Sequence, residues 1–329
     1  MKNIAVIGSG SWGVALSLVL HKNGHNVRLW SYNPEEARLI NEEKYCKFLP
    51  DVVLPENFPC FTSLEETLEN AELVLIVTPS NAIRVTLEKM KPYVHKNQIF
   101  VLCSKGMEKE TQKVYTEVIS EVLPTVKIAA LSGPSHAEEV SKNIPTAVVV
   151  ASKDNDVLSE LQNVFMNDTF RVYTNTDVYG VELGGSLKNI ISLCAGIAIG
   201  LGYGDNTIAA LITRGLLEIS RLGVAAGAEM QTFYGLTGLG DLFVTCSSVH
   251  SRNRKCGILI GQGLTIEEAK KEVGMVVEGL NAIDGAYILV KKYGIYAPII
   301  LEVYDVINNG KSPKEATYNL MTKGKKAEN

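Results

Sequence analysis

A glycine-rich turn near the start of the chain has the spacing of a phosphate-binding loop. The stretch GSGSWG, residues 8–13, follows the apolar run NIAVIG and opens the helical pattern SWGVALSLVLHKNG. In a GxGxxG turn, Gly8 permits the tight bend, Gly10 lets a pyrophosphate approach the backbone, and Gly13 allows close helix–strand packing. The motif predicts dinucleotide binding, with Ser11 and Trp12 lining the cofactor. The alternative is a tight turn without a ligand.

The end of the second strand leaves the choice of dinucleotide open. Trp30, Ser31, Tyr32 and Asn33 stand where a dehydrogenase specific for NAD usually places an acid against the ribose 2′-hydroxyl. There is no carboxylate to repel a 2′-phosphate and no arginine to attract one. Either NAD or NADP remains possible at this point.

A lysine lies within an apolar, small-residue helix. In ELGGSLKNIISLCAGIAIG, residues 182–200, Lys188 is the only charge between Glu182 and Asp205. Burying an unpaired ammonium costs several kcal/mol or forces it to release its proton, so this lysine suits proton transfer. The alternative is a structural lysine whose head reaches water.

Further polar residues follow the ends of predicted strands. Lys105 stands in SKGME, and Gly133 and Ser135 stand in SGPSHAEE. Ligands of open α/β sheets gather at the carboxyl ends of strands, so these residues are expected to converge beside the nicotinamide. The alternatives are a solvated loop lysine and a helix capped by Ser135.

Two stretches of the second half also have candidate groups. Asp241 follows a glycine-rich turn in LTGLGDLFVTC and is either a catalytic carboxylate or a helix cap. The stretch VHSRNRKCG brings together Ser251, Arg252 and Asn253. A guanidinium and an amide suit a phosphate, whereas the alternative is a solvated basic turn.

Two parts of the chain, with different sequence patterns, must position these groups. Up to about residue 177, short apolar runs alternate with helical segments: NIAVIG, NVRLW, LVLIVTP, IFVLCS, KIAALSG, TAVVVAS and FRVYTN. Continuous apolar runs between helices indicate a parallel sheet buried on both faces. The remainder predicts helices over 178–200, 206–226, 231–247 in part, 265–273, 278–293, 298–308 and 312–321. We expect a Rossmann-like, mostly parallel sheet domain over 1–178 and an all-helical domain over 179–329.

Composition excludes several functional classes. The 329 residues are 46% hydrophobic and 21% charged with a net charge of −4, which argues against nucleic acid as a partner. The six cysteines form no CxxC pair, so no metal site is expected. No signal peptide and no membrane insertion are expected, and the predicted location is cytoplasmic.

Nine motifs occur in order over nearly the whole chain: GSGSWG, SKGME, SGPSHAEEV, GVELGGSLKNII, GLGYGDN, ALITRGL, LTGLGDL, TCSSVHSRNRKCG and MVVEG. Together they resemble the NAD(P)-dependent glycerol-3-phosphate dehydrogenases of the bacterial type. The resemblance implies reversible hydride transfer between NAD(P)H and dihydroxyacetone phosphate, giving sn-glycerol 3-phosphate for phospholipid synthesis. It also implies a phosphorylated small-molecule substrate, and we expect a homodimer.

The resemblance assigns roles residue by residue. It makes Lys188 the general acid/base and places Asn189, Lys105 and Asp241 around the carbonyl. Substrate contacts are implied for Lys105, Gly133, Ser135, Lys188, Asp241, Ser251, Arg252 and Asn253. Cofactor contacts are implied for Gly8, Gly10, Ser11, Trp12, Gly13, Tyr32, Asn33, Lys105, Ala137, Arg252, Val276 and Glu278. Relatives that favour NADPH often have His or Arg at the positions of Tyr32 and Asn33, so the assignment there is open.

Two rival functions remain. Another dehydrogenase with a Rossmann domain, a helical domain and a helix lysine, of the 6-phosphogluconate or ketopantoate type, explains the architecture but not SGPSHAEE together with HSRNR. A dinucleotide sensor without catalysis needs the glycine turn but has no use for Lys105, Lys188 and Asp241 together.

Overall fold

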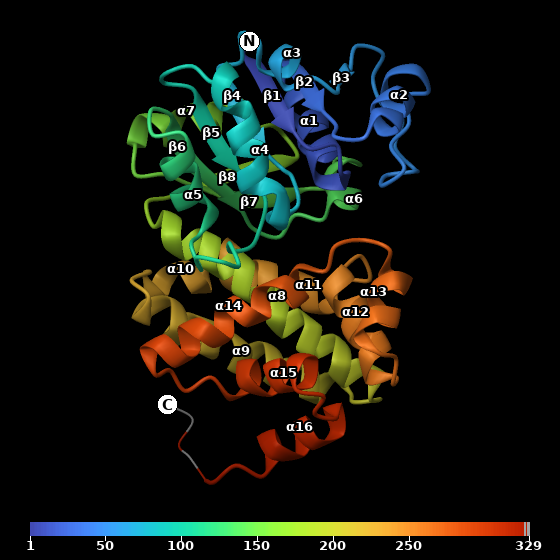
Figure 1. Cartoon of the computed structure of the whole chain (residues 1–329), viewed down its shortest axis with the longest axis vertical. Helices are drawn as coiled ribbons and strands as arrows, with labels where there is room; N and C mark the ends of the chain where they lie inside the picture. The colour runs from blue at the N-terminus through green and yellow to red at the C-terminus, as the bar shows by residue number, and fades with distance from the viewer. Residues whose placement is uncertain (326, 328–329) are drawn as a thin grey trace. The chain divides into compact units, whose positions relative to one another are not determined.

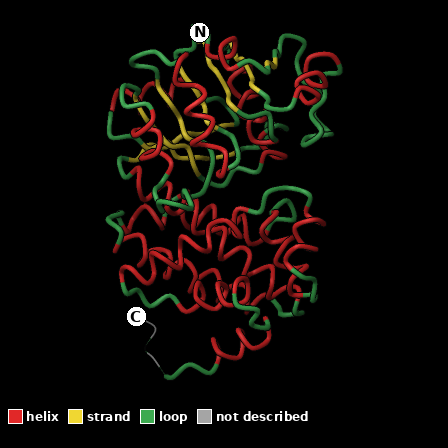
Figure 2. The backbone as a smooth tube through the Cα atoms, viewed as in Figure 1, coloured by secondary structure: helices red, strands yellow, loops and turns green. Residues whose placement is uncertain are grey.

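The computed structural model describes residues 1–325 and 327. The chain forms two compact units, Met1–Glu182 and Leu183–Asn329, and the division falls inside one long helix, α8 (Val178–Gly200). In the described residues, every strand belongs to the first unit, and the second unit is built from helices (Figures 1 and 2). The expected fold class is therefore confirmed.

The first unit is built around one sheet of eight strands (Figure 1). The order is β3-β2-β1-β4-β5-β6-β7-β8, whose first six strands have the arrangement of a dinucleotide-binding sheet. The strands are β1 Asn3–Ile7, β2 Asn26–Trp30, β3 Cys60–Phe61, β4 Leu73–Ile76, β5 Ile99–Leu102, β6 Lys127–Ser132, β7 Thr146–Ala151 and β8 Phe170–Asn175. Sequence order reverses between β1 and β4, which is where such sheets bind their ligands.

The central strands are apolar on both sides because helices cover both faces. Leu73–Ile76 and Ile99–Leu102 are buried at every position. The α-helices of this unit are α1 Ser11–Lys22, α2 Pro34–Glu42, α3 Leu64–Leu68, α4 Ile83–Met90, α5 Tyr115–Val122, α6 Ala137–Val140 and α7 Asn155–Phe165. Their buried side chains and those of the strands form one hydrophobic core.

The sheet differs from a fully parallel one at a single pair of strands. All neighbours are parallel except β6 and β7, which are antiparallel. The segment between them holds only the four-residue helix α6. A parallel crossover usually needs a full helix, so a short connection returns the chain in the opposite direction.

The second unit contains the rest of α8 and eight further α-helices in the described residues. They are α9 Asp205–Ala225, α10 Met230–Tyr234, α11 Asp241–Ser247, α12 Arg252–Gly261, α13 Ile266–Val273, α14 Glu278–Tyr293, α15 Pro298–Asn308 and α16 Pro313–Met321. The segment expected as one partial helix over 231–247 consists of α10, a π-helical turn η3 (Leu236–Gly240) and α11. Helix α12 was not among the predicted helices.

Helix α8 packs against α12 at very close range. A Cβ added to Gly196 would lie 2.2 Å from the Arg254 carbonyl oxygen, and one added to Gly257 would lie 2.2 Å from that of Leu193. Gly200 and Gly261, one turn further along each helix, are equally close to backbone atoms of the opposite helix. The glycines of α8 therefore set its distance from α12, the helix that begins at the basic cluster.

Helix α8 is also long and apolar enough to cross a membrane by length and composition. However, 89% of its most apolar window is buried within the protein. The apolar composition is thus accounted for by packing in the interior.

Candidate functional site

Three glycines shape the turn between β1 and α1, each in a different way. Gly8 has a φ of +127°, and a Cβ there would lie 2.8 Å from the Val77 carbonyl oxygen. A Cβ on Gly13 would lie 1.9 Å from the Gly8 carbonyl oxygen. Gly10 has no heavy atom within 4 Å of the same position. Gly8 and Gly13 are therefore required by the fold, whereas Gly10 leaves open space over the backbone.

The first turn of α1 is suited to an anion. Ser11 and Trp12 begin the helix, and Gly10 precedes it without a side chain that caps the helix. The first turn has no acidic residue. Backbone N–H groups and the positive end of the helix dipole therefore point toward the space above Gly10.

The residues after β2 have mostly local roles. Tyr32 is 81% exposed and lies near Lys89, whose Nζ is 5.9 Å from the ring centroid. The Asn33 side chain accepts a hydrogen bond from the Glu35 backbone N–H and caps α2. Ser31 is completely buried. The structure thus gives Asn33 a capping role that the sequence analysis had not assigned.

Lys105 and Ser135 meet at one carbonyl group. Lys105 Nζ donates to the Gly133 oxygen at 3.1 Å, and Ser135 Oγ donates to the same oxygen at 2.9 Å. Gly133 has a φ of +127°, which favours glycine. The N-cap of α6 is His136, so the alternative in which Ser135 caps that helix is wrong. These three residues form one polar cluster after the ends of β5 and β6, and its place beside the nicotinamide stays a prediction.

The loop that carries Lys105 is braced by an ion pair. Glu108 is buried and receives two hydrogen bonds from Arg84, at 2.6 and 2.8 Å, while Thr111 donates to it at 2.6 Å. The Arg84 guanidinium holds the pKa of Glu108 below its usual value. This pair fixes the path of the loop three residues beyond Lys105.

Lys188 is buried and paired. Its side chain is 6% exposed, and its Nζ donates to Asp241 Oδ1 at 2.9 Å and to Thr245 Oγ1 at 2.5 Å. Thr245 in turn donates to the Asp241 carbonyl oxygen one turn earlier on α11. The alternative of a lysine head in water is therefore wrong. Asp241 begins α11 and holds the ammonium with its carboxylate.

A chain of amides runs beside this ion pair. Asn253 Nδ2 donates to Asn189 Oδ1 at 2.8 Å, and Asn253 Oδ1 accepts from the Gly279 backbone N–H at 2.8 Å. Asn189 Nδ2 donates to the Gly185 oxygen at 3.3 Å. A Cβ on Gly279 would lie 2.7 Å from the backbone carbonyl oxygen of Asn189. The two asparagines thus connect α8, α12 and α14.

Ser192 connects the lysine to the basic cluster. Its Oγ donates to the Thr245 carbonyl oxygen at 2.8 Å and lies 3.2 Å from Ser251 Oγ. Ser251 is buried and caps α12 by accepting from the Arg254 N–H. Arg252, the first residue of α12, is exposed. The basic cluster is therefore the beginning of a helix and not a solvated turn.

The remaining expected cofactor contacts lie at helix starts. Ala137 is the first residue of α6 and is buried. Glu278 is the first residue of α14, and Val276 lies two positions before it. The Asn281 side chain donates to Glu278 at 3.3 Å.

The expected site residues form a group in each unit. The sheet unit holds Gly8, Gly10, Ser11, Trp12, Gly13, Tyr32, Asn33, Lys105, Gly133, Ser135 and Ala137. The helical unit holds Lys188, Asn189, Asp241, Ser251, Arg252, Asn253, Val276 and Glu278. Within the helical unit, contacts connect Lys188 to Asp241 directly and to Ser251 through Thr245 and Ser192.

The thiol of Cys246, which follows Thr245 on α11, does not compete with the lysine. Burial raises the pKa of Cys246 to about 12, so the thiol stays protonated at neutral pH. A protonated, buried thiol is a poor nucleophile and a poor metal ligand.

Sequence reasoning missed Thr245 and Ser192. Thr245 stands four residues after Asp241, which places both on one face of α11, so this spacing could have indicated it. Ser192 stands four residues after Lys188 and therefore lies on the same face of α8. A polar side chain one turn from a buried charge is the signal in both cases.

Comparison with known proteins gives matches over both halves of the chain. Residues 3–158 match the family model of the NAD-dependent glycerol-3-phosphate dehydrogenase N-terminus, and residues 177–318 match that of the C-terminus. Proteins named glycerol-3-phosphate dehydrogenase (NAD(P)+) from Fusobacterium nucleatum and Agathobacter rectalis are 52% and 49% identical. The matches cover 100% of this chain and 99% and 98% of those proteins.

A solved structure agrees along the full length. The crystal structure of glycerol-3-phosphate dehydrogenase from Coxiella burnetii superposes with a TM-score of 0.94 at 38% identity. The match covers 98% of this chain and 99% of that one.

Proposed function

Because the chain belongs to the NAD-dependent glycerol-3-phosphate dehydrogenase family, we propose that it reduces dihydroxyacetone phosphate to sn-glycerol 3-phosphate and catalyses the reverse reaction. The cofactor is NAD or NADP. The observation that carries the proposal is the buried pair of Lys188 and Asp241, linked through Thr245 and Ser192 to the start of α12. That arrangement connects a proton donor, Lys188, to a helix start that can bind an anion, within the same helical unit.

The glycine turn fits the pyrophosphate of the cofactor. The open space over Gly10 is a cradle that any side chain would fill, and the first turn of α1 has no acidic group to repel an anion. Backbone N–H groups of Ser11 and Trp12 would hold the phosphates there. When bound, the reduced nicotinamide supplies the hydride.

The substrate phosphate is proposed to bind at the start of α12. Arg252 offers an exposed guanidinium, and the first turn of the helix adds N–H groups and a partial positive charge. Ser251 and Asn253 are committed to hydrogen bonds within the protein. Their main effect is then to fix where Arg252 and the helix start lie.

Lys188 is proposed to donate the proton. As the carbonyl carbon accepts a hydride, its oxygen becomes an alkoxide and takes a proton from the ammonium, and the resulting amine recovers a proton from water. Asp241 holds Lys188 Nζ in place and stabilises its charged form, while Thr245 orients it. In the reverse direction the neutral amine accepts the proton of the alcohol.

The other expected residues support this chemistry. Lys105, held on the Gly133 oxygen, is proposed to lie by the carbonyl group together with Asn189. The unit that holds the glycine turn is proposed to bind the cofactor, and residues 179–329 to bind the substrate.

The proposed setting follows from the family. The product would supply glycerophospholipid synthesis. A cytoplasmic location is proposed, and the six free cysteines agree with a reducing compartment. A homodimer is also proposed, and light scattering of the purified chain tests it.

Steady-state turnover tests the function. Purified protein is assayed with dihydroxyacetone phosphate and NADH or NADPH, alongside ketopantoate with the same cofactors and 6-phosphogluconate with NAD+ or NADP+. Reduction of dihydroxyacetone phosphate alone is the expected result. Turnover of a rival substrate, or cofactor binding without any turnover, would contradict the proposal.

A further inference from the structure

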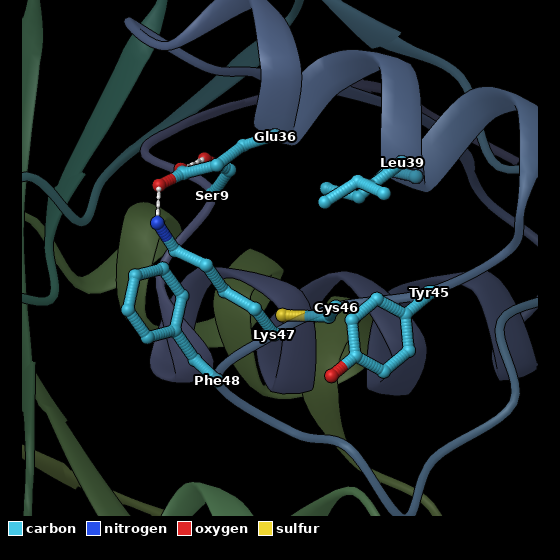
Figure 3. A pocket seen from close by; sticks show the side chains of 8 residues that line it. Ser9, Glu36, Leu39, Tyr45, Cys46, Lys47 and Phe48 are labelled. Carbon is cyan, nitrogen blue, oxygen red and sulfur yellow. Dashed lines mark hydrogen bonds and ion pairs between the residues drawn. The ribbon is translucent and has the colours of Figure 1, made fainter.

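A carboxylate from α2 lies between the glycine turn and the end of β2. Glu36 Oε2 is 2.9 Å from Ser9 Oγ (Figure 3). The same oxygen is 3.3 Å from Ser31 Oγ, and the two serine oxygens are 2.7 Å apart. Ser9 lies between the first two glycines of the turn, and Ser31 follows the last residue of β2. Both serines are buried, so the carboxylate is held from the interior.

The second oxygen of this carboxylate faces a lysine. Lys47 Nζ is 2.7 Å from Glu36 Oε1, and it also lies 4.7 Å from the centroid of the Phe48 ring. The Glu36 side chain is 18% exposed and that of Lys47 is 46% exposed. Figure 3 shows Lys47 reaching toward Glu36 beside the Phe48 ring. The carboxylate is therefore positioned on both sides but remains accessible.

The space between the glycine turn and the end of the second strand has an established role in dinucleotide-binding sheets. The adenosine ribose lies between the glycine turn and the end of the second strand, where an acid accepts a hydrogen bond from its 2′-hydroxyl. In this chain the residues that follow the second strand are Ser31, Tyr32 and Asn33, and none of them is acidic. We propose that Glu36 takes this role from α2 and is the residue that discriminates against the 2′-phosphate of NADP. The inference rests on the proposed function.

The ion pair between Glu36 and Lys47 determines how strongly NADPH binding is weakened relative to NADH binding. A 2′-phosphate beside Glu36 meets a like charge, which weakens binding. Lys47 offsets part of this repulsion because its ammonium lies against the same carboxylate. NADPH is then accepted, but with lower affinity than NADH.

The test compares dissociation constants in the full-length protein. NADH and NADPH are titrated into wild type and Glu36→Gln by calorimetry, and the ratio of the two constants is taken. Glutamine keeps the shape and an acceptor for Ser9 but removes the charge. The ratio should shift toward NADPH by about tenfold or more, as for loss of an interaction with a charged group. Glu35→Gln, an exposed neighbour that pairs with Arg38, should leave the ratio unchanged.

A second measurement needs no variant. Wild type should bind adenosine 5′-monophosphate more tightly than adenosine 2′,5′-bisphosphate. A bisphosphate that binds as tightly or more tightly overturns the inference, as does an unchanged ratio in Glu36→Gln. Wild type that binds neither NADH nor NADPH overturns the proposed function as well, so the two failures are distinguishable.

Discussion

At the scale of single residues, the buried pair of Lys188 and Asp241 is where structure and chemistry depend on each other. Their side chains are 6% and 2% exposed, so neither charge is well solvated. Removing one partner of a buried pair leaves the other uncompensated and costs about 3–5 kcal/mol. A single substitution therefore tests stability and catalysis together, and only a paired substitution separates them.

We expect Lys188→Met to lose turnover and stability at the same time, because Asp241 is left buried without its ammonium. The double variant Lys188→Met with Asp241→Asn should regain most of the unfolding free energy, measured by denaturant titration. Its reduction rate should stay roughly 10²–10⁴-fold below wild type, the usual contribution of a positioned general acid. NADH binding should persist in the double variant. Recovered turnover there would show that the lysine is purely structural.

We expect Arg252→Ala to raise the KM for dihydroxyacetone phosphate. A charge-assisted contact contributes about 1.5–3 kcal/mol, or roughly ten- to a hundredfold in affinity. Lys255→Ala is the matched control, since Lys255 is an exposed cation on the same helix that donates to the Glu272 carbonyl oxygen. Equal KM values for wild type and Arg252→Ala would place the phosphate elsewhere.

At the scale of elements, glycines decide how closely segments approach one another or a ligand. Gly8 and Gly13 allow the glycine turn to pack closely on neighbouring backbone, whereas Gly10 leaves open space above the turn. Gly196 and Gly257 allow α8 and α12 to pack in backbone contact. These roles predict different outcomes for the same chemical change, the addition of one methyl group.

Gly10→Ala should fold normally but bind NADH weakly. The added methyl group meets no heavy atom within 4 Å, yet it stands where the pyrophosphate would approach. Thermal unfolding and NADH titration measure the two effects separately. Gly13→Ala provides the contrast, because its methyl group would lie 1.9 Å from the Gly8 oxygen and should lower the unfolding temperature. An unaltered NADH affinity in Gly10→Ala would count against the proposed cradle.

Gly196→Ala should destabilise the helical unit and reduce turnover. Its methyl group would lie 2.2 Å from the Arg254 carbonyl oxygen, so α8 and α12 must separate. Overpacking of this kind typically costs about 1–3 kcal/mol. Denaturant titration measures the loss, and Gly324→Ala, where the methyl group meets nothing within 4 Å, is the control. A normal unfolding free energy would mean that the two helices adjust without strain.

At the scale of the whole molecule, each unit holds a buried carboxylate that binds backbone N–H groups. Glu182 accepts from the N–H and the hydroxyl of Thr116, and Glu218 accepts from the N–H groups of Ile299 and Ile300 at the start of α15. Burial raises the pKa of each to about 7, above its ordinary value of 4.5. The folded protein therefore holds these protons more tightly than the unfolded chain.

These two carboxyl groups should accordingly lower stability as the pH rises from about 4.5 to about 7, opposed in part by His25, whose pKa is lowered by burial. Urea titrations between pH 5 and pH 7.5 measure the trend, in a range where carboxylates with lowered pKa values, such as Glu72, Glu108 and Asp154, stay ionised. The variant with Glu182→Gln and Glu218→Gln should show a flatter dependence. The same slope in wild type and variant would show that other groups control it.

The sequence by itself determined the sheet unit, most helices of the second unit and the family to which the chain belongs. Local signals carried these predictions: apolar runs of strand length, a GxGxxG turn between a strand and a helix, and a lone lysine in an apolar helix. Each depends on neighbours within a few residues. The family resemblance then rested on motifs that can be read directly from the chain.

Only the tertiary structure decided how distant residues meet. Glu36 on α2 meets Ser9 of the glycine turn, which lies 27 positions earlier in the chain. Thr245 and Ser192 complete the surroundings of Lys188 through contacts across more than 50 positions. Helix α12 escaped prediction because its glycines lower helix propensity, while close packing on α8 stabilises it. The antiparallel direction of β7 also depends on its pairing with β6 in the sheet. Such features follow from long-range packing, which local propensity does not record.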